Sequence, residues 1–281
     1  QVLRRIVEMF HAQGLVPVVA PEIEFYLVKR NTDPDYPLEP PVGRSGRKET
    51  VRQPYSMDAV DEFEPFIQDI YDYCEVQRLH VDNLAHETGT AQLEINFQHG
   101  DPIELSDQMF LFKRTVRETA MRHEIYATFM AKPMEHEPGS SMHWHISLRR
   151  ASDGGNAFSN PDGSESELFR QFIGGIQKYG PDATLLSAPY VNSYRRFTRH
   201  LSAPINLQWG YDNRTVGLRV PHSDPDNRRI ENRLAGADVN PYLAIAASPA
   251  CGLKSACSPM RRRRAALTSG HLHCRAACPT R

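Results

Sequence analysis

The sequence predicts a chain that combines α-helices with β-strands. Amphipathic segments carry apolar residues at the three- and four-residue spacing of a buried helix face. Shorter segments are rich in Val, Ile, Phe and Tyr, and several of them repeat charged residues at every second position. With 281 residues, 40% of them hydrophobic and 24% charged, the chain can form one large domain or two small ones.

The composition argues against several classes of protein. The formal net charge is -1, so the charge balance predicts neither nucleic acid nor an anionic membrane as a partner. No apolar run approaches the about 18 residues of a membrane-spanning helix. Only Cys74 of the five cysteines precedes residue 251, which leaves no disulfide framework in most of the chain. We therefore expect a cytoplasmic protein.

The pattern gives an order of elements along the chain. We expect a helix over 1–14, a strand over 15–29, a loop over 31–54 rich in Pro, Gly and charge, a helix over 58–79, a strand carrying Glu94 within 86–97, a helix over 106–123, a strand over 125–130, a Gly/Ser turn and strand within 139–148, a loop over 156–163, a helix over 164–179, a strand over 229–233 and a helix from 240 to 247. Ser106 is expected to cap the helix over 106–123, and Ser164 with Glu167 to form a capping box. Phe110 and Leu111 are expected on the buried stripe of the former helix.

Two strands carry acidic or imidazole pairs on one face, because strand residues alternate between faces. Glu22 and Glu24 point the same way, which is tolerable on an exposed face or around a divalent cation. His143 and His145 follow a Gly/Ser turn that could approach a phosphate. A single histidine is usually structural, but two at this spacing favour a functional site.

The stretch 228–233 has the most unusual charge pattern. Arg229, Glu231 and Arg233 share one face if the stretch is a strand. A solvated edge strand with cross-strand ion pairs would explain such a row. The carboxylates and histidines on the other strands favour a face turned toward a charged ligand instead.

These groups together indicate a chemistry. Oxygen-rich ligands with a single imidazole suit Mg²⁺ or Mn²⁺ rather than zinc. Arginines beside such ions suit phosphoryl groups and carboxylates. Divalent ions and arginines without an obvious nucleophile predict phosphoryl transfer by positioning and charge neutralisation. The sequence has neither a Walker-type phosphate loop nor a GxGxxG fingerprint.

A set of motifs in fixed order carries a resemblance to a known family. The chain contains PEIEF, ETGTAQLEINF, GSSMHWHISL, VNSYRR, NRTVGLRVP, RRIENR and ADVNPYLA. Over about residues 1–250 it resembles the catalytic domain of the glutamine synthetase superfamily. The resemblance implies an α+β fold in which a curved antiparallel sheet, backed by helices, forms a funnel around two divalent metals.

The resemblance also implies roles for individual residues. It assigns one metal to Glu24, Glu87 and Glu94, and the second to Glu22, His143 and Glu231. Arg219 and Arg229 would contact the ATP phosphates and the transferred group, with His145 and Ser147 close to the nucleotide. Arg196 and Arg233 would bind the substrate carboxylates, Gly139 the amino-acid backbone, and Arg214 the acyl phosphate.

The implied reaction is ligation of glutamate to an amine. The γ-carboxylate attacks ATP to give γ-glutamyl phosphate and ADP, and an amine then displaces phosphate. Ammonia-using members have a glutamate near the amine, whereas the aligned position here is Ser202, which cannot act as an ordinary base. The run APINLQWGYDNRT resembles the γ-glutamylpolyamine synthetase branch, so we expect putrescine or a similar amine. A glutamine synthetase using ammonia, or an inactive structural member of the fold, are the alternatives; the six metal-binding residues argue against the latter.

The two ends of the chain are expected to differ from the family pattern. The superfamily's N-terminal β-grasp domain, which completes a neighbouring active site in ring-shaped homo-oligomers, is not present in this chain. We expect residues 1–250 to form a catalytic domain incomplete at both ends, and residues 251–281 an aberrant Arg/Cys-rich tail that is frameshifted or disordered. His271, His273 and Cys274 could suggest zinc, but their spacing fits no standard finger.

Overall fold

The computed structural model describes residues 1–198 and 203–256. Eight strands within this part of the chain form one sheet in the order β2-β3-β1-β5-β8-β7-β6, with β4 paired to β1 beside that path. All pairs are antiparallel except β6 with β7. The predicted α+β class is confirmed, with a mostly antiparallel sheet.

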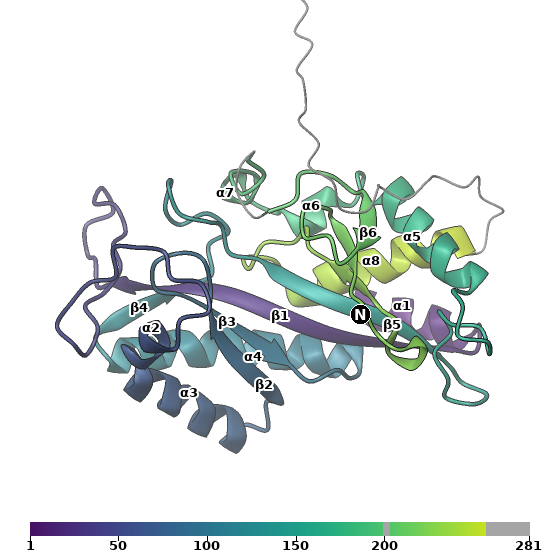
Figure 1. Ribbon diagram of the computed structural model, residues 1–281, viewed down its shortest axis with the longest axis horizontal. Helices are drawn as coiled ribbons and strands as arrows, with labels where there is room; N and C mark the ends of the chain where they lie inside the picture. The colour runs from purple at the N-terminus through teal and green to yellow at the C-terminus, as the bar shows by residue number, and fades with distance from the viewer. Residues whose placement is uncertain (199–202, 257–281) are drawn as a thin grey trace, which may run out of the picture.

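The strand β1 (Leu15–Lys29) organises the sheet and crosses the molecule in Figure 1. It pairs with β3 (Gln92–Phe97), β4 (Ile125–Thr128) and β5 (Met142–Arg150). The register sets Glu22 opposite His143 and Glu24 opposite Glu94. The acidic and imidazole residues of three strands are therefore neighbours by backbone pairing alone.

The remaining strands extend the sheet at both ends. β2 (Val81–His86) pairs with β3, and β8 (Ile230–Asn232) pairs with β5. β7 (Leu218–Val220) follows β8, and β6 (Trp209–Tyr211) lies at the end of the sheet. This order places β8, with Arg229 and Arg233 directly before and after it, beside the histidine-bearing strand β5, and β7 with Arg219 one strand further away.

Helices supply the apolar residues that complete the core. They are α1 (Val2–His11), α2 (Met57–Asp61), α3 (Glu64–Val76), α4 (Pro102–Arg122), α5 (Glu167–Tyr179), α6 (Thr184–Ser187), α7 (Val191–Tyr194), the 3₁₀ helix η1 (Pro225–Asn227) and α8 (Pro241–Ala256). In Figure 1, α3 and α4 lie along one side of β1, and α5 and α8 lie near the opposite end of the sheet. Phe10, Phe112 and Phe172, from α1, α4 and α5, belong to the same buried cluster as Trp144 of β5.

The expected start of the helix over 106–123 is wrong. The helix begins at Pro102, and the Asp101 side chain accepts hydrogen bonds from the backbone N–H groups of Ile103 and Glu104. An aspartate cap followed by proline satisfies the first free N–H groups without any contribution from Ser106. Ser106 lies inside the helix, where its hydroxyl donates to the Pro102 carbonyl.

Two further helix expectations differ from the structure. The cap of α5 is Ser166, whose hydroxyl accepts from Phe169 N, while Ser164 bonds to Asp162 in the preceding turn. The expected helix over 58–79 is divided into α2 and α3, with Pro65 in the first turn of α3. Proline has no N–H to continue a helix from the preceding turn, so a new helix starts there.

Two other features were not anticipated. Strand β2 lies between the expected helix over 58–79 and the expected strand within 86–97, where the sequence VDNLAH lacks the clear alternation that would predict a strand. Phe110 and Leu111, expected on the buried stripe, are 60% and 43% exposed, while Val116 is fully buried. The buried stripe of α4 follows Leu105, Met109 and Phe112 instead.

The end of the described chain is helical. Helix α8 continues through the expected boundary at residue 250, and Cys251 and Leu253 are buried against the core. The rest of the expected tail, including His271, His273 and Cys274, lies outside the described residues. No helix in the described ranges is long and apolar enough to span a membrane.

Candidate active site

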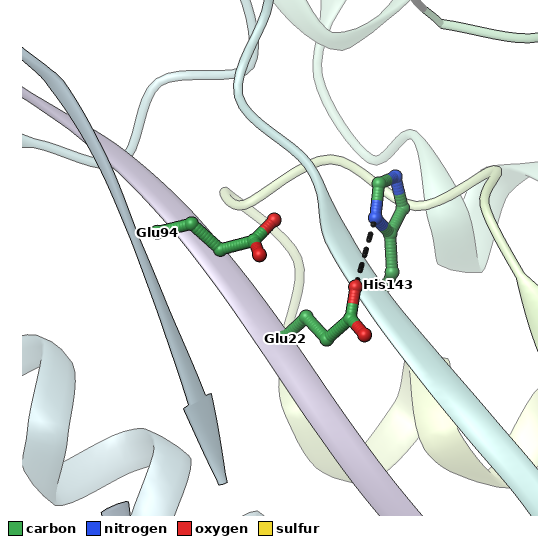
Figure 2. A group of neighbouring side chains, drawn as sticks. All are labelled: Glu22, Glu94 and His143. Carbon is green, nitrogen blue, oxygen red and sulfur yellow. Dashed lines mark ion pairs between the residues drawn. The ribbon is translucent and has the colours of Figure 1, made fainter. Parts of the chain in front are cut away.

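Acidic and histidine side chains from three strands converge on one face of the sheet. Glu22 of β1, Glu94 of β3 and His143 of β5 offer ligand atoms within 4.8 Å of one another. Figure 2 shows these three side chains gathered between their strands. A Glu22 oxygen lies 3.5 Å from His143 Nδ1. Each side chain comes from a different strand, so this cluster depends on the sheet register.

A second cluster shares Glu22 with the first. His145 and Glu231 join Glu22 within the same 4.8 Å limit. His145 Nε2 lies 2.7 Å from a Glu22 oxygen, and His143 Nδ1 lies 3.9 Å from a Glu231 oxygen. Glu22 therefore bridges two adjacent groups of possible ligands.

Glu24 lies deeper than Glu22 and is held by the protein itself. One of its oxygens accepts hydrogen bonds from Ser141 N at 2.9 Å and from Gln92 Nε2 at 3.1 Å. Burial and the nearby charge of Glu87 raise the pKa of Glu24 to about 8. Burial and the charges of Glu24, Glu22 and Glu87 raise the pKa of Glu94 to about 9.

The pKa values of Glu22 and His143 are lowered rather than raised. Burial alone would raise the pKa of Glu22, but hydrogen bonds with His143 and His145 outweigh burial and hold it well below its usual range. Burial and the charge of Arg233 lower the pKa of His143 to about 4. The imidazole is therefore neutral near pH 7, the form that binds a metal ion.

These residues fit a divalent cation. Glu24 and Glu94 face each other across the β1–β3 pair, and burial together with nearby carboxylates makes both reluctant to ionise. A cation among them would remove this penalty, because it favours the charged carboxylate. Several carboxylates with one neutral imidazole match Mg²⁺ or Mn²⁺. The two clusters that could hold a metal ion contain Glu22, Glu94, His143, His145 and Glu231. Glu24 and Glu87 lie beside these clusters.

Arginines in β7 and on either side of β8 border the second cluster. Arg219 Nη1 donates to one oxygen of Glu231 at 2.6 Å, and Arg233 Nη1 donates to the other. Burial raises the pKa of Glu231, but the charges of His143 and Arg233 outweigh it and lower the value overall. Arg229 donates to His145 Nδ1 at 3.2 Å. The buried guanidinium of Arg233 and the half-buried guanidinium of Arg219 thus share one carboxylate, leaving positive charge on this side of the site.

A large cavity opens beside Glu22. Its volume is ≈ 780 Å³, and its lining includes Glu22, His145, Ser147 and Arg229. Three of the four residues predicted to contact the nucleotide therefore line one cavity: His145, Ser147 and Arg229. Arg219, the fourth predicted nucleotide residue, lies behind this wall on Glu231.

The residues predicted to bind the substrate are dispersed around the clusters. The Arg196 guanidinium is buried and donates to Ser141 Oγ and to the carbonyl oxygens of Arg233 and Leu234. Gly139 packs against it so closely that a Cβ there would lie 2.5 Å from Arg196 Cγ. Arg214 is exposed and donates to the Tyr55 hydroxyl at 3.2 Å.

Some residues of the site were missed by the sequence analysis. Gln92 holds Glu24, and its spacing of two from Glu94 in ETGTAQLEINF was the available signal. Ser141 holds both Glu24 and Arg196. Tyr55 and Asp212 contact the predicted arginines, but both lie in segments without a regular pattern.

A family model described as "Glutamine synthetase, catalytic domain" matches residues 1–257. The chain belongs to this family. The match confirms the resemblance that the motifs indicated.

Curated relatives of the glutamine synthetase family cover most of the chain. It is 41% identical over 248 residues to gamma-glutamylputrescine synthetase PuuA of Escherichia coli, covering 88% of this chain and 52% of that protein. It is 36% identical over 252 residues to a glutamine synthetase of Pyrococcus abyssi, covering 90% and 54%. The chain spans about half the length of the curated relatives it matches.

Solved structures agree on the glutamine synthetase fold. One named "Apo GmaS without ligand" has a TM-score of 0.76 at 27% identity, covering 93% of this chain and 59% of that chain. A Plasmodium falciparum glutamine synthetase has a TM-score of 0.81 at 22% identity, covering 91% and 55%. At that identity the second likeness supports the fold alone.

Proposed function

We propose that the protein is an ATP-dependent ligase that joins the γ-carboxyl of glutamate to an amine such as putrescine. One observation carries the proposal: the Glu/His clusters lie between a cavity of ≈ 780 Å³ and the arginines that flank Glu231. This arrangement suits a reaction in which anionic phosphate and carboxylate must approach each other. Family membership supports the same reaction class.

The metal ions would be Mg²⁺ or Mn²⁺. Glu24, Glu87 and Glu94 would hold one, and Glu22, His143 and Glu231 the other, as the resemblance implies. His145 is a further possible ligand or nucleotide contact, because it approaches Glu22 at 2.7 Å. When bound, the ions supply positive charge that polarises phosphoryl oxygens and neutralises the charge that develops on them.

In the first step, the chain orients two anions against each other. His145, Ser147 and Arg229 bind the nucleotide along the cavity wall, and Arg219 and Arg229 neutralise the γ-phosphoryl group. Gly139, Arg196 and Arg233 hold glutamate. An oxygen of its γ-carboxylate bonds to the γ-phosphorus, the bond from phosphorus to the bridging oxygen of ADP breaks, and ADP leaves.

In the second step, the amine nitrogen bonds to the γ-carbonyl carbon of γ-glutamyl phosphate. The carbon–oxygen bond to phosphate then breaks, phosphate leaves, and a water molecule takes the proton that the nitrogen gives up. Arg214, exposed and held by Tyr55, would stabilise the charge on the acyl phosphate. Binding and charge neutralisation account for both steps without a covalent enzyme intermediate.

Two observations support a diamine or polyamine as the acceptor. The E. coli relative at 41% identity is named gamma-glutamylputrescine synthetase, and the glutamine synthetase of P. abyssi is 36% identical. The sequence also has Ser202 where ammonia-using members have glutamate, although Ser202 lies outside the described residues. Ammonia is the alternative acceptor, favoured by the many glutamine synthetases at similar identity. An inactive member of the fold is the third possibility.

The full protein is proposed to act as a ring-shaped homo-oligomer, as the resemblance implies. Large apolar side chains on and around α6 and α7 support a contact surface there. Leu185, Tyr190 and Val191 are 63%, 62% and 81% exposed. Such groups of exposed apolar residues commonly mark interfaces, and sedimentation of the full-length protein tests the assembly.

ADP release tests the reaction and its acceptor. The full-length protein is given glutamate, ATP and Mg²⁺ with putrescine, a simple monoamine or ammonium at equal concentration. Turnover with putrescine and little with ammonium supports the proposal, and Ser202→Glu should then raise the ammonium rate. Ammonium as the best acceptor would identify a glutamine synthetase. No amine-dependent ADP release, with Mn²⁺ still bound, would favour the inactive member.

A further inference from the structure

The loop that follows β1 reaches across to the turn that carries Glu87. Glu49 of this loop lies 42 residues before Ala91, and one of its oxygens accepts from Ala91 N at 2.7 Å. The same oxygen lies 3.0 Å from His86 Nε2. The side chains of Glu49 and His86 are 9% and 0% exposed, so this contact is buried.

His86 also contacts the backbone of Glu87. Its Nδ1 donates to the Glu87 carbonyl oxygen at 2.7 Å, since a carbonyl oxygen only accepts. The imidazole is thus bonded through both nitrogens, to Glu49 on one side and to the Glu87 backbone on the other. A ring fixed in this way has little freedom to rotate.

The turn itself has a backbone that needs support. Ala91 has φ of 54°, a left-handed conformation that an alanine Cβ disfavours. Leu27 N donates to the Ala91 carbonyl oxygen at 2.9 Å, while Glu49 accepts from its N–H group. Ala91 is thereby held from both sides, by β1 and by the loop, with Glu87 four residues before it.

Other contacts join the same loop to the same turn. Tyr55 N donates to the His86 carbonyl oxygen at 2.9 Å. Arg52 Nε donates to Glu137 at 3.4 Å, and Glu137 accepts from Thr90 N at 3.3 Å. The loop thus contacts the turn near both of its ends.

We propose that Glu49 is a positioning residue that, through His86 and Ala91 N, fixes the 87–92 turn and so the place of the Glu87 carboxylate in the metal site. This inference rests on the proposed function, in which Glu87 binds a metal. The loop over 31–54, expected to be a surface loop, would then help to complete the metal site from outside the sheet.

A simpler role would be to anchor the loop alone. The second oxygen of Glu49, Oε1, is buried and has no hydrogen-bond partner among the described residues. A buried carboxylate with one oxygen unsatisfied is a costly anchor, because burying an unpaired polar atom is unfavourable. An exposed pair such as Lys48 with Glu39 anchors the loop without that cost.

The test uses the full-length protein with Glu49→Ala, Glu49→Gln and the control Glu39→Ala, which removes the exposed ion pair in the same loop. Mn²⁺ binding is measured calorimetrically without ATP or amine. Glu49→Ala should weaken the binding by about tenfold or more, as loss of a residue that orients a ligand does. Glu49→Gln should restore most of it, because its amide oxygen can take the place of Oε2, where it still accepts from Ala91 N and lies beside His86 Nε2. Glu39→Ala should bind Mn²⁺ as the wild type does.

Amide hydrogen exchange gives a second reading that needs no metal. In Glu49→Ala, peptides over residues 87–92 should exchange faster while peptides from α4 and α5 keep the wild-type rate. Mn²⁺ affinity unchanged in Glu49→Ala, or weakened equally by Glu39→Ala, would overturn the proposal. Failure of the ligase proposal is a separate outcome, because it appears as absent amine-dependent ADP release while exchange in the turn still responds to Glu49.

Discussion

Glu231→Gln tests the buried charge group where β7 and β8 meet. Glu231 is 1% exposed and holds Arg219 and Arg233 on separate oxygens. Glutamine keeps the shape but removes the negative charge, so its amide nitrogen would face one guanidinium. Arg219 keeps Asp212 at 3.2 Å and is 19% exposed, whereas Arg233 is 7% exposed. Arg233 therefore loses more favourable charge interaction than Arg219 does.

The expected magnitude follows from the burial. Leaving a buried charge without its partner costs about 3–5 kcal/mol, and the partial compensation at Arg219 places this case at about 3 kcal/mol. If the free energy of unfolding falls by roughly 3 kcal/mol per molar urea, the urea concentration at the unfolding midpoint of the metal-free protein should fall by about 1 M. Mn²⁺ should also raise that midpoint less than in the wild type, because one predicted ligand is lost.

Urea titration followed by fluorescence, with and without Mn²⁺, measures both effects. Glu64→Gln is the matched control, since Glu64 pairs with Arg44 at 62% and 52% exposure and such surface pairs contribute little. If Glu231→Gln unfolds at the wild-type urea concentration, the buried group is not the energetic unit that its contacts indicate. If it also retains full ADP release, Glu231 is not a metal ligand.

Three further outcomes follow from the structure. Ser147→Leu should narrow the cavity beside Glu22 and raise the dissociation constant for ADP by about tenfold in calorimetry; unchanged affinity would place the nucleotide elsewhere. The metal-free protein should lose thermal stability as pH rises from about 6.5 to 9, because folded Glu24 and Glu94, with pKa values raised from 4.5 to about 8 and about 9, keep protons that the unfolded chain releases. Added Mn²⁺ should therefore stabilise the protein more at high pH than at low pH. Thermal stability that rises over this pH range would contradict the assignment. The lowered pKa of His143 acts in the other direction, but only below about pH 6.5. Asp101→Ala should cost about 1 kcal/mol of unfolding free energy through the lost cap of α4, whereas Glu118→Ala, at an exposed position in the same helix, is the control.

Strand periodicity explains why residues of the Glu/His clusters could be predicted from the sequence. The period of two put Glu22 with Glu24, and Glu231 with its flanking arginines, on shared faces, and the pairing of β1, β3 and β5 brings three such faces together. Strand β1 has the expected bounds because its apolar run between Gly14 and Arg30 has no competing helical pattern. Local patterns of this kind survive folding because each residue's face is fixed by its own strand.

Features that depend on partners distant in sequence could not be read in the same way. The cap of α4 moved to Asp101 because several polar residues could satisfy the same free N–H groups, and packing selected one. Ligand grouping is a second case: the clusters unite Glu22 with Glu94 and His143, and with His145 and Glu231, according to register and rotamer.

The family and the mixed α and β composition follow from the sequence, because ordered motifs and local periodicity predict them. The same periodicity predicted the acidic and histidine residues that meet in the Glu/His clusters. The folded arrangement sets which carboxylates bond to protein groups and which remain available to a ligand. Glu24 is held by Ser141 and Gln92, and Glu49 reaches Ala91 from a loop without any pattern. Such contacts depend on three-dimensional distance between segments far apart in the chain, which residue spacing does not encode.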